Sequence, residues 1–142
     1  MGDVIERQYD EIVIGETAFV TKTITAELVR AFAEVSEDVN PMHLDPDFAA
    51  GTVFGEPVAH GMLGASLISA VIGTRLPGPN SIYLGQEMRF TAPTRIGDTL
   101  TAECEVLEKR TDKPIMRLRT TVTRQDGIAV LQGEAVVKKE GS

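Results

Sequence analysis

Two short segments of this chain contain residue types suited to acid–base chemistry beside an anion-binding backbone. In the first, Asp38 and His43 flank Asn40-Pro41, so a proline-stiffened turn separates a carboxylate from an imidazole. In the second, Gly61 begins an apolar stretch that we expect to form a helix. A carboxylate and an imidazole exchange protons near neutral pH, and the N–H groups at a helix N-terminus favour negative charge. Together they could add water across, or remove it from, a bond beside a thioester carbonyl.

The first segment also has a purely structural interpretation, in which Asp38 caps a turn and His43 packs in a loop. For either residue alone, that interpretation would be preferred. Their pairing around Asn40-Pro41, just before a glycine-led helix, favours the chemical interpretation. Asn40 itself is expected to hold the loop through side-chain to backbone hydrogen bonds rather than to contact a substrate.

The second segment supplies three further candidate site residues. Gly61 would let a carbonyl group come close because it has no side chain, although a plain tight turn would also explain a glycine here. His60, directly before the helix, could be a ligand or a base; such a histidine more often hydrogen-bonds backbone and shapes the turn. Ser69 lies eight residues into the helix. It would either line the far end of a pocket or bond back to a backbone carbonyl.

A metal site is the main alternative for these residues. His43, Asp45 and His60 provide two imidazoles and a carboxylate, the ligand set of non-haem iron sites. However, Asp45 is better explained as the N-cap of a short helix with Pro46 at its first position. We therefore expect no metal, and the chain has no glycine-rich nucleotide-binding motif.

Composition limits the class of protein. The chain has 142 residues, which fits a single domain over 1–142, and its 42% hydrophobic residues are enough for a core. The formal net charge of −7 argues against binding to nucleic acid or to anionic membranes. The longest apolar run is too short to span a bilayer, and Met1 to Glu6 does not resemble a signal peptide. We therefore expect a soluble cytoplasmic protein.

The elements that must position the candidate residues follow from the spacing of apolar residues. Thr17 to Ile24 is rich in β-formers and predicts a strand. Thr25 can then cap a helix that ends near Ser36 and carries its apolar stripe on Leu28, Phe32 and Val35. The segment from Gly61 to Arg75 is apolar or small on every side, which predicts a helix buried all round.

From Ser81 onward the apolar residues alternate, which predicts strands. The lone cysteine, Cys104, is expected to be a small hydrophobe within one of them. Asp126-Gly127 predicts a hairpin turn. In all we predict five strands, four of them consecutive and antiparallel, curled around the long helix in an α+β fold. The faces expected to point inward are Ile82, Leu84, Met88 and Phe90; Leu100, Ala102, Cys104 and Val106; Met116, Leu118 and Val122; and Ala129, Leu131, Gly133, Ala135 and Val137.

Three motifs give the chain a family resemblance over about residues 15 to 140. They are residues 36–45, which contain Asp38 and His43, residues 57–63, which contain His60-Gly61, and residues 81–86. With these motifs the chain resembles the MaoC-like, hot-dog fold (R)-specific enoyl-CoA hydratases. It looks particularly like the short bacterial enzymes that supply polyhydroxyalkanoate synthesis from fatty-acid β-oxidation.

The resemblance implies specific roles for the candidate residues. It implies that Asp38 and His43 act together on one water and that the Gly61 amide binds the thioester oxygen. It also implies that Ser69 and Ile72 lie near the acyl tail and limit its length. The fold family further implies a homodimer with sheets joined edge to edge, an acyl-CoA substrate, and no cofactor beyond the coenzyme A that the substrate carries.

Two other functions remain open on the sequence alone. The same fold family includes thioesterases, which would release free thiol from acyl-CoA, whereas hydration consumes the double bond without releasing thiol. A non-catalytic acyl-CoA-binding module would bind the thioester without turning it over. Such a module has no use for a paired acid and base, which favours the hydratase.

Overall fold

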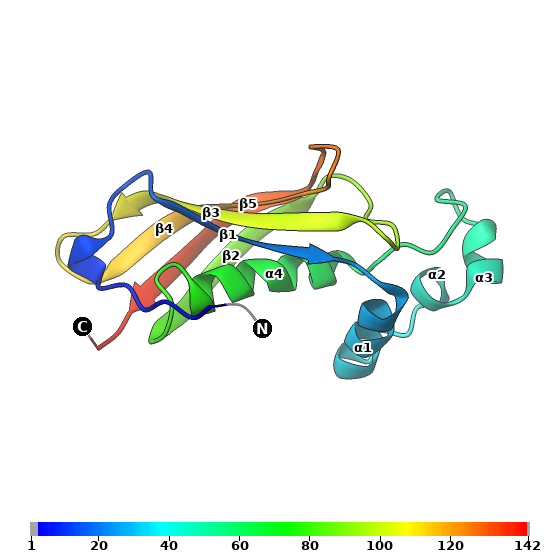
Figure 1. The fold of residues 1–142 in the computed structure, drawn as a ribbon, viewed down its shortest axis with the longest axis horizontal. Helices are drawn as coiled ribbons and strands as arrows, with labels where there is room; N and C mark the ends of the chain where they lie inside the picture. The colour runs from blue at the N-terminus through cyan, green and yellow to red at the C-terminus, as the bar shows by residue number, and fades with distance from the viewer. Residues whose placement is uncertain (1–2, 142) are drawn as a thin grey trace.

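The computed structural model describes residues 3–141 and consists of one curled antiparallel sheet, one long helix and a group of short helices (Figure 1). The five strands lie in the order β1-β3-β4-β5-β2, so β2 lies beside β5 although β3 and β4 intervene in the chain. The strands are β1 (Thr17–Thr23), β2 (Ser81–Phe90), β3 (Thr99–Lys109), β4 (Ile115–Thr123) and β5 (Ala129–Lys139). All four ladders are antiparallel, which confirms the direction predicted for the last four strands and adds the pairing of β1 with β3.

The long helix α4 (Gly61–Thr74) packs against all five strands, which confirms the predicted sheet wrapped around a helix. The prediction that α4 is buried all round is wrong. Leu63, Ile68 and Val71 are buried against the sheet. The positions exposed along the opposite side are Met62, Ser66, Ser69 and Gly73. These positions are three or four residues apart, so the protomer leaves one stripe of this helix uncovered.

The inner faces of β3 and β4 follow the predicted alternation. Leu100, Ala102, Cys104 and Val106 of β3 are almost completely buried, as are Met116, Leu118 and Val122 of β4. Cys104 is a buried small side chain, and its burial raises the pKa of the thiol to about 12. A thiol with so high a pKa is a poor nucleophile at neutral pH.

Strand β2 departs from the predicted pattern. A bulge interrupts its pairing with β5, so Tyr83 lies opposite Val137 whereas Gly85 lies opposite Val136. The extra residue, Leu84, reverses the alternation, and Ile82 therefore does not share a face with Met88. Ile82 and Leu84 are exposed on this edge strand of the protomer.

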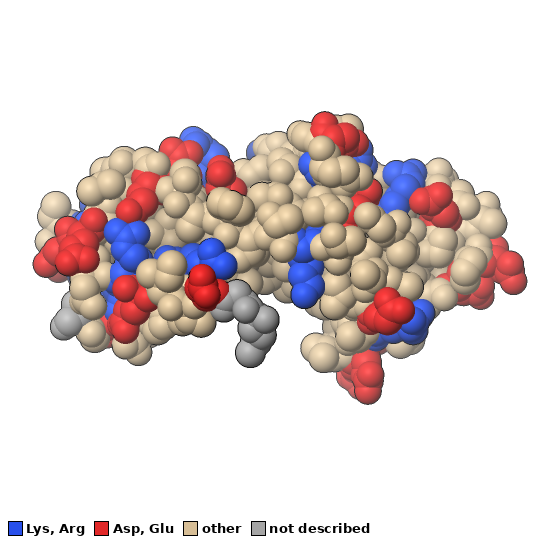
Figure 2. All heavy atoms as spheres, viewed as in Figure 1, with Lys and Arg blue, Asp and Glu red and all other residues tan. Residues whose placement is uncertain are grey.

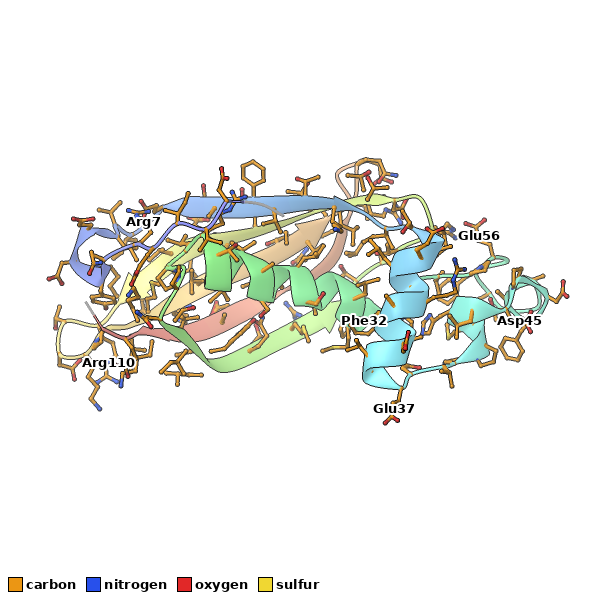
Figure 3. All side chains as sticks on the ribbon, turned by 60° about the horizontal axis from the view of Figure 1, so that its bottom comes forward. Arg7, Phe32, Glu37, Asp45, Glu56 and Arg110 are labelled. Carbon is orange, nitrogen blue, oxygen red and sulfur yellow. The ribbon has the colours of Figure 1, made fainter. Side chains whose placement is uncertain are left out.

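Three short helices, α1 (Ala26–Ser36), α2 (Pro41–Leu44) and α3 (Pro46–Ala50), project beyond one end of the sheet (Figure 1). We call residues 25–60 the helical overhang. Thr25 caps α1 by accepting a hydrogen bond from the Leu28 N–H, as predicted. The predicted stripe on α1 is partly wrong, because Val29 and Ala33 are its buried residues and Val35 is 85% exposed. Figure 3 shows Phe32 on the side of α1 that faces the start of α4.

The N-terminal segment contributes to the core, which the sequence pattern did not indicate. Tyr9, in the 3₁₀ turn Tyr9–Glu11, and Ile12 both belong to the buried cluster. Lys109 of β3 holds this turn by donating to the carbonyl oxygens of Tyr9 and Ile12, at 2.7 and 2.6 Å. Among the described residues, no helix is long and apolar enough to cross a membrane.

Candidate active site

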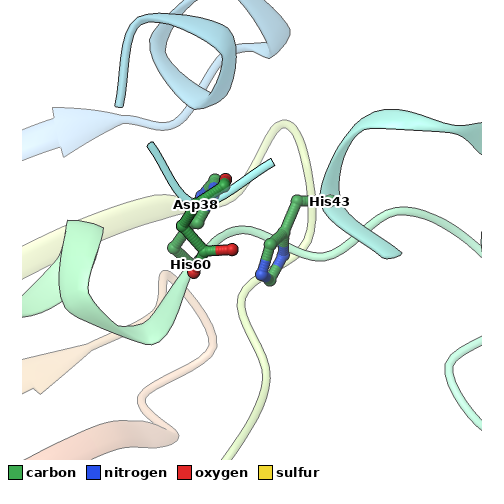
Figure 4. A group of neighbouring side chains, drawn as sticks. All are labelled: Asp38, His43 and His60. Atoms are coloured by element: carbon green, nitrogen blue, oxygen red, sulfur yellow. The ribbon is translucent and has the colours of Figure 1, made fainter. Parts of the chain in front are cut away.

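Asp38, His43 and His60 come together where the helical overhang meets the first turn of α4 (Figure 4). One polar atom of each side chain lies within 4.8 Å of the other two. Two atoms that share a hydrogen-bonded water can be up to about 5.6 Å apart, twice a normal hydrogen-bond length. A single water can therefore contact the carboxylate and an imidazole nitrogen at once.

Asp38 is held by the backbone that follows α1. Glu37 takes a left-handed conformation, with φ 64°, and turns the chain away from the helix. One carboxylate oxygen of Asp38, Oδ1, accepts a hydrogen bond from the Asn40 N–H at 3.2 Å, as in the structural interpretation of this residue. The other oxygen, Oδ2, accepts no hydrogen bond from the described residues 3–141, which leaves it available to a ligand.

Asn40 starts the short helix that carries His43. Its side chain accepts a hydrogen bond from the Met42 N–H at 3.1 Å, and Pro41 occupies the first helical position. Asn40 thus makes the side-chain to backbone bond expected of it. His43 lies on this helix rather than in a loop, so the capping of α2 sets the direction of the imidazole.

His43 has one ring nitrogen fixed and one free. Its Nδ1 lies 2.6 Å from the Val58 carbonyl oxygen. A carbonyl only accepts, so Nδ1 carries the hydrogen and Nε2 is the nitrogen that can exchange a proton with a ligand. His43 also lines a cavity of about 540 Å³, together with Met42, Val58, Gly61, Met62 and Phe90.

His60 contacts both of the other two residues. Its Nε2 is 2.9 Å from the backbone oxygen of Asp38, and its ring stacks on His43 with the centroids 3.9 Å apart. His60 is 3% exposed, and its buried Nδ1 has no hydrogen-bond partner among residues 3–141. The backbone hydrogen bond is the one expected from its position before the helix.

Gly61 places its N–H at the N-terminus of α4, and the residue lines the 540 Å³ cavity. No group within residues 3–141 accepts a hydrogen bond from this N–H. The helix dipole adds a partial positive charge there. A Cβ at Gly61 would lie 2.7 Å from Cε1 of Phe90, so the close approach of Phe90 favours glycine at this position.

A metal ion does not fit this cluster well. A histidine binds a metal through a lone pair in the plane of its ring, and the stacked rings of His43 and His60 are inclined by only 30°. Their lone pairs therefore converge poorly on one point. Asp45, the carboxylate of the alternative ligand set, caps α3 by accepting hydrogen bonds from the Asp47 and Phe48 N–H groups.

Comparisons with known proteins agree with the motifs. Residues 14–127 match the MaoC like domain. The chain is 52% identical over 125 residues to an (R)-specific enoyl-CoA hydratase of Aeromonas caviae, covering 88% of this chain and 93% of that protein. It is 46% identical over 135 residues to the (R)-specific enoyl-CoA hydratase of Rhodospirillum rubrum, covering 95% and 93%. The chain belongs to the MaoC-like family.

A solved structure agrees as well. The (R)-hydratase from A. caviae involved in PHA biosynthesis superposes with a TM-score of 0.89 at 50% identity, covering 91% of this chain and 98% of that one. The curled sheet around α4 is thus the hot-dog fold of the MaoC-like proteins, as the resemblance implied.

The MaoC-like chain contains a second cavity, of about 440 Å³, between the exposed side of α4 and β2. Ser69 lines this cavity together with Ser66, Met88 and the bulged segment of β2. Ile72 does not line it, because this side chain is 2% exposed and points into the core. The structure therefore does not bring Ile72 together with Ser69 on the wall of this cavity.

Sequence reasoning missed several residues at these cavities. Met62 lines both of them. Tyr83 donates to Gln86, which in turn donates to Thr120 at 2.9 Å, and burial raises the pKa of Tyr83 to about 12. Gly85 within an otherwise strand-like run was the available signal for the bulge that brings these residues together.

Proposed function

We propose that this chain is an (R)-specific enoyl-CoA hydratase that adds water reversibly to trans-2-enoyl-CoA. The observation that carries the proposal is the convergence of Asp38 and His43 within reach of one water, with His43 on the wall of the cavity that Gly61 also lines. The identity to curated hydratases over most of both chains supports the same reaction. The relatives named above are all hydratases, which does not favour a thioesterase or a non-catalytic binding module.

In the proposed reaction, the water oxygen forms a bond to C3 of the substrate and loses one proton to Asp38 or His43. The π electron pair of the C2–C3 bond moves toward the thioester, and its oxygen takes up negative charge. The Gly61 N–H stabilises that charge, an interaction typically worth about 10²–10³ in rate. The other side chain donates a proton to C2, and proton exchange between the two side chains and solvent restores the site.

The geometry limits which atoms take part. Since Nδ1 of His43 is bound to Val58, the imidazole acts through Nε2. The Asn40 N–H bond to Oδ1 of Asp38 fixes the carboxylate and leaves Oδ2 free to accept from the water. We assign the acyl tail to the 440 Å³ cavity beside Ser69. The reaction needs no cofactor other than the coenzyme A of the substrate.

A hydration assay tests the proposal. Purified protein with trans-crotonyl-CoA should remove the ultraviolet absorbance of the conjugated thioester without releasing thiol, and chiral analysis should find the (R)-3-hydroxy product. Octenoyl-CoA in the same assay would report how the cavity accepts longer tails. Free thiol, an (S) product or no turnover of either substrate would contradict the proposal.

We further propose that the protein acts as a homodimer in the cytoplasm, where acyl-CoA thioesters are made and used. Strand β2 is an edge of the protomer's sheet and exposes Ile82, Tyr83 and Leu84, next to the exposed Met62 of α4. An uncovered edge with apolar side chains favours association with a second strand. Light scattering should give twice the chain mass, and Leu84→Glu should give a monomer. Fractionation of cells expressing the tagged chain tests the location.

A further inference from the structure

The contacts of His60 single it out as more than a turn-forming residue. It is one of only two histidines in the chain, and it touches both members of the proposed catalytic pair. Its Nε2 bonds the main chain of Asp38, whereas its ring lies against the ring of His43. The ring of Phe32, on α1, also packs against the His60 ring, with the centroids 5.0 Å apart.

The hydrogen bonds assign opposite tautomers to the two imidazoles. The Asp38 carbonyl accepts from Nε2 of His60, so His60 carries its hydrogen on Nε2. The Val58 carbonyl accepts from Nδ1 of His43, so His43 carries its hydrogen on Nδ1 when it is neutral. A backbone hydrogen bond therefore prevents each ring from rotating, and in His43 this bond leaves Nε2 free for the reaction.

The position of His60 in the chain links three parts of the site. It is the N-cap residue of α4, so Gly61 and its free N–H follow it directly. Its side chain reaches back over 22 residues to Asp38, and its ring supports His43 from behind. One rigid imidazole therefore sets the distances between the carboxylate, the reacting imidazole and the amide that meets the thioester oxygen.

We propose that His60 is a positioning residue for the hydration reaction, acting through Asp38 and His43 and not on the substrate itself. Both of its properties are needed: the Nε2–H group fixes the Asp38 main chain, and the flat ring fixes the tilt of His43. Phenylalanine preserves a ring but has no donor, whereas glutamine preserves a donor but has no ring. These two substitutions therefore separate the two contributions.

Steady-state kinetics with crotonyl-CoA test the role. His60→Phe and His60→Gln should each lower kcat by about tenfold to a hundredfold, because displacing a reacting group by about 1 Å can cost a hundredfold. KM should change less than about threefold, since neither substitution alters a group that binds the substrate. His60→Ala should be the slowest of the three. Leu118→Ala, which loosens the core far from the site, is the control for a merely structural loss.

The outcomes separate this inference from the proposed function on which it rests. Variants with wild-type kcat, a rise in KM alone, or a loss no greater than that of Leu118→Ala at equal folded fraction would each overturn the positioning role. Nitrogen-15 NMR of the wild-type protein above about pH 8, where an ordinary histidine is neutral, needs no turnover. It should find hydrogen on Nε2 of His60 and on Nδ1 of His43, with His43→Gln providing the assignment.

A different tautomer at His60 would overturn the inference even if the variants fold poorly. An inactive wild-type protein with the expected tautomers would instead refute the hydratase proposal and leave the geometric arrangement intact.

Discussion

The sheet-and-helix body and the helical overhang are stabilised in different ways. The body is held by apolar packing, because the inner faces of β3 and β4 are buried almost completely against α4. The overhang has few buried side chains and is held by short-range hydrogen bonds to backbone. The side chains that make these bonds are Thr25, Ser36, Asp38, Asn40, Asp45 and Thr52.

The reacting groups lie mainly in the region that is held by hydrogen bonds rather than by apolar packing. Asp38 and His43 lie in the overhang, and Gly61 lies at the boundary where the body begins. Substituting a reacting side chain of the overhang should therefore disturb activity with little effect on the stability of the body. Shortening a buried side chain in the body should instead lower stability and leave the activity per folded molecule nearly unchanged. The overhang is also rich in acidic residues, and Figure 2 shows acidic groups exposed at this end of the molecule.

The largest effect is expected from the reacting groups of the overhang. Asp38→Asn and His43→Gln should each lower kcat by about 10²–10⁴-fold, the usual contribution of a general acid or base. The midpoint of thermal unfolding should change little, because neither side chain is part of the apolar core. Asp47→Asn, in the first turn of α3, is the control on the same segment and should keep most activity. Near-wild-type rates in either catalytic variant would remove that residue from the mechanism.

In the body, Leu118→Ala should show the opposite behaviour. Leu118 is completely buried on β4, and removing a buried leucine side chain costs about 2–5 kcal/mol of unfolding free energy. Urea denaturation followed by circular dichroism measures this loss. The kcat per folded molecule should stay close to wild type. Val35→Ala in the overhang is the contrasting case, because Val35 is 85% exposed and should change the unfolding free energy by little.

The two regions also differ in how far the sequence predicts them. In β3, alternating Leu100, Ala102 and Cys104 predicted the inner face correctly, because a sheet with one buried face imposes a period of two. In β2 the same argument failed at Leu84, because a bulge adds one residue and reverses the alternation. The pairing of β2 with β5 depends on distant parts of the chain, and no local pattern encodes it.

The residues of the site also differ in how far the sequence predicts them. Asp38 and His43 could be proposed from residue type, spacing and family resemblance, and Asp45 from its position before Pro46. The stack of His60 on His43 and the packing of Phe90 on Gly61 could not, because each joins residues brought together only by the tertiary fold. Ile72 was placed at the tail by helical spacing, whereas the curvature of the sheet buries it in the core.

Gly61 lies at the boundary between the two regions, and its substitution is expected to have an effect of intermediate size. Gly61→Ala keeps the backbone N–H but puts a Cβ 2.7 Å from Cε1 of Phe90, so one of the two residues must move. A shift of this size should lower kcat/KM by about tenfold to a hundredfold. The double variant Gly61→Ala with Phe90→Ala should recover most of the loss. The departure of its effect from the sum of the two single effects measures the coupling between positions 61 and 90. A double variant as slow as Gly61→Ala alone would show that Phe90 is not the cause.

The smallest effect is expected where the N-terminal segment joins the body, through the ion pair of Glu6 with the buried Lys139 at 2.9 Å. The hydrogen bond from Lys139, with its positive charge, lowers the pKa of Glu6 below its ordinary value of 4.5. A carboxyl with a lowered folded-state pKa stabilises the protein above its unfolded-state pKa, and this stabilisation is lost as the pH falls through the folded-state pKa.

Thermal unfolding of the wild-type protein between about pH 6 and pH 3 should therefore show a loss of stability that begins near the ordinary glutamate pKa. Glu6→Gln should lower stability at pH 6 and make this part of the acid dependence shallower, whereas Glu11→Gln on the exposed 3₁₀ turn should leave it unchanged. Equal slopes in all three proteins would mean that the pair contributes nothing measurable. Because Glu6 is partly exposed to solvent, the difference should be small and should decrease with added salt. Glu6→Gln should not affect the overhang, so kcat at pH 7 should be unchanged. The body would then lose stability while the active site keeps its activity.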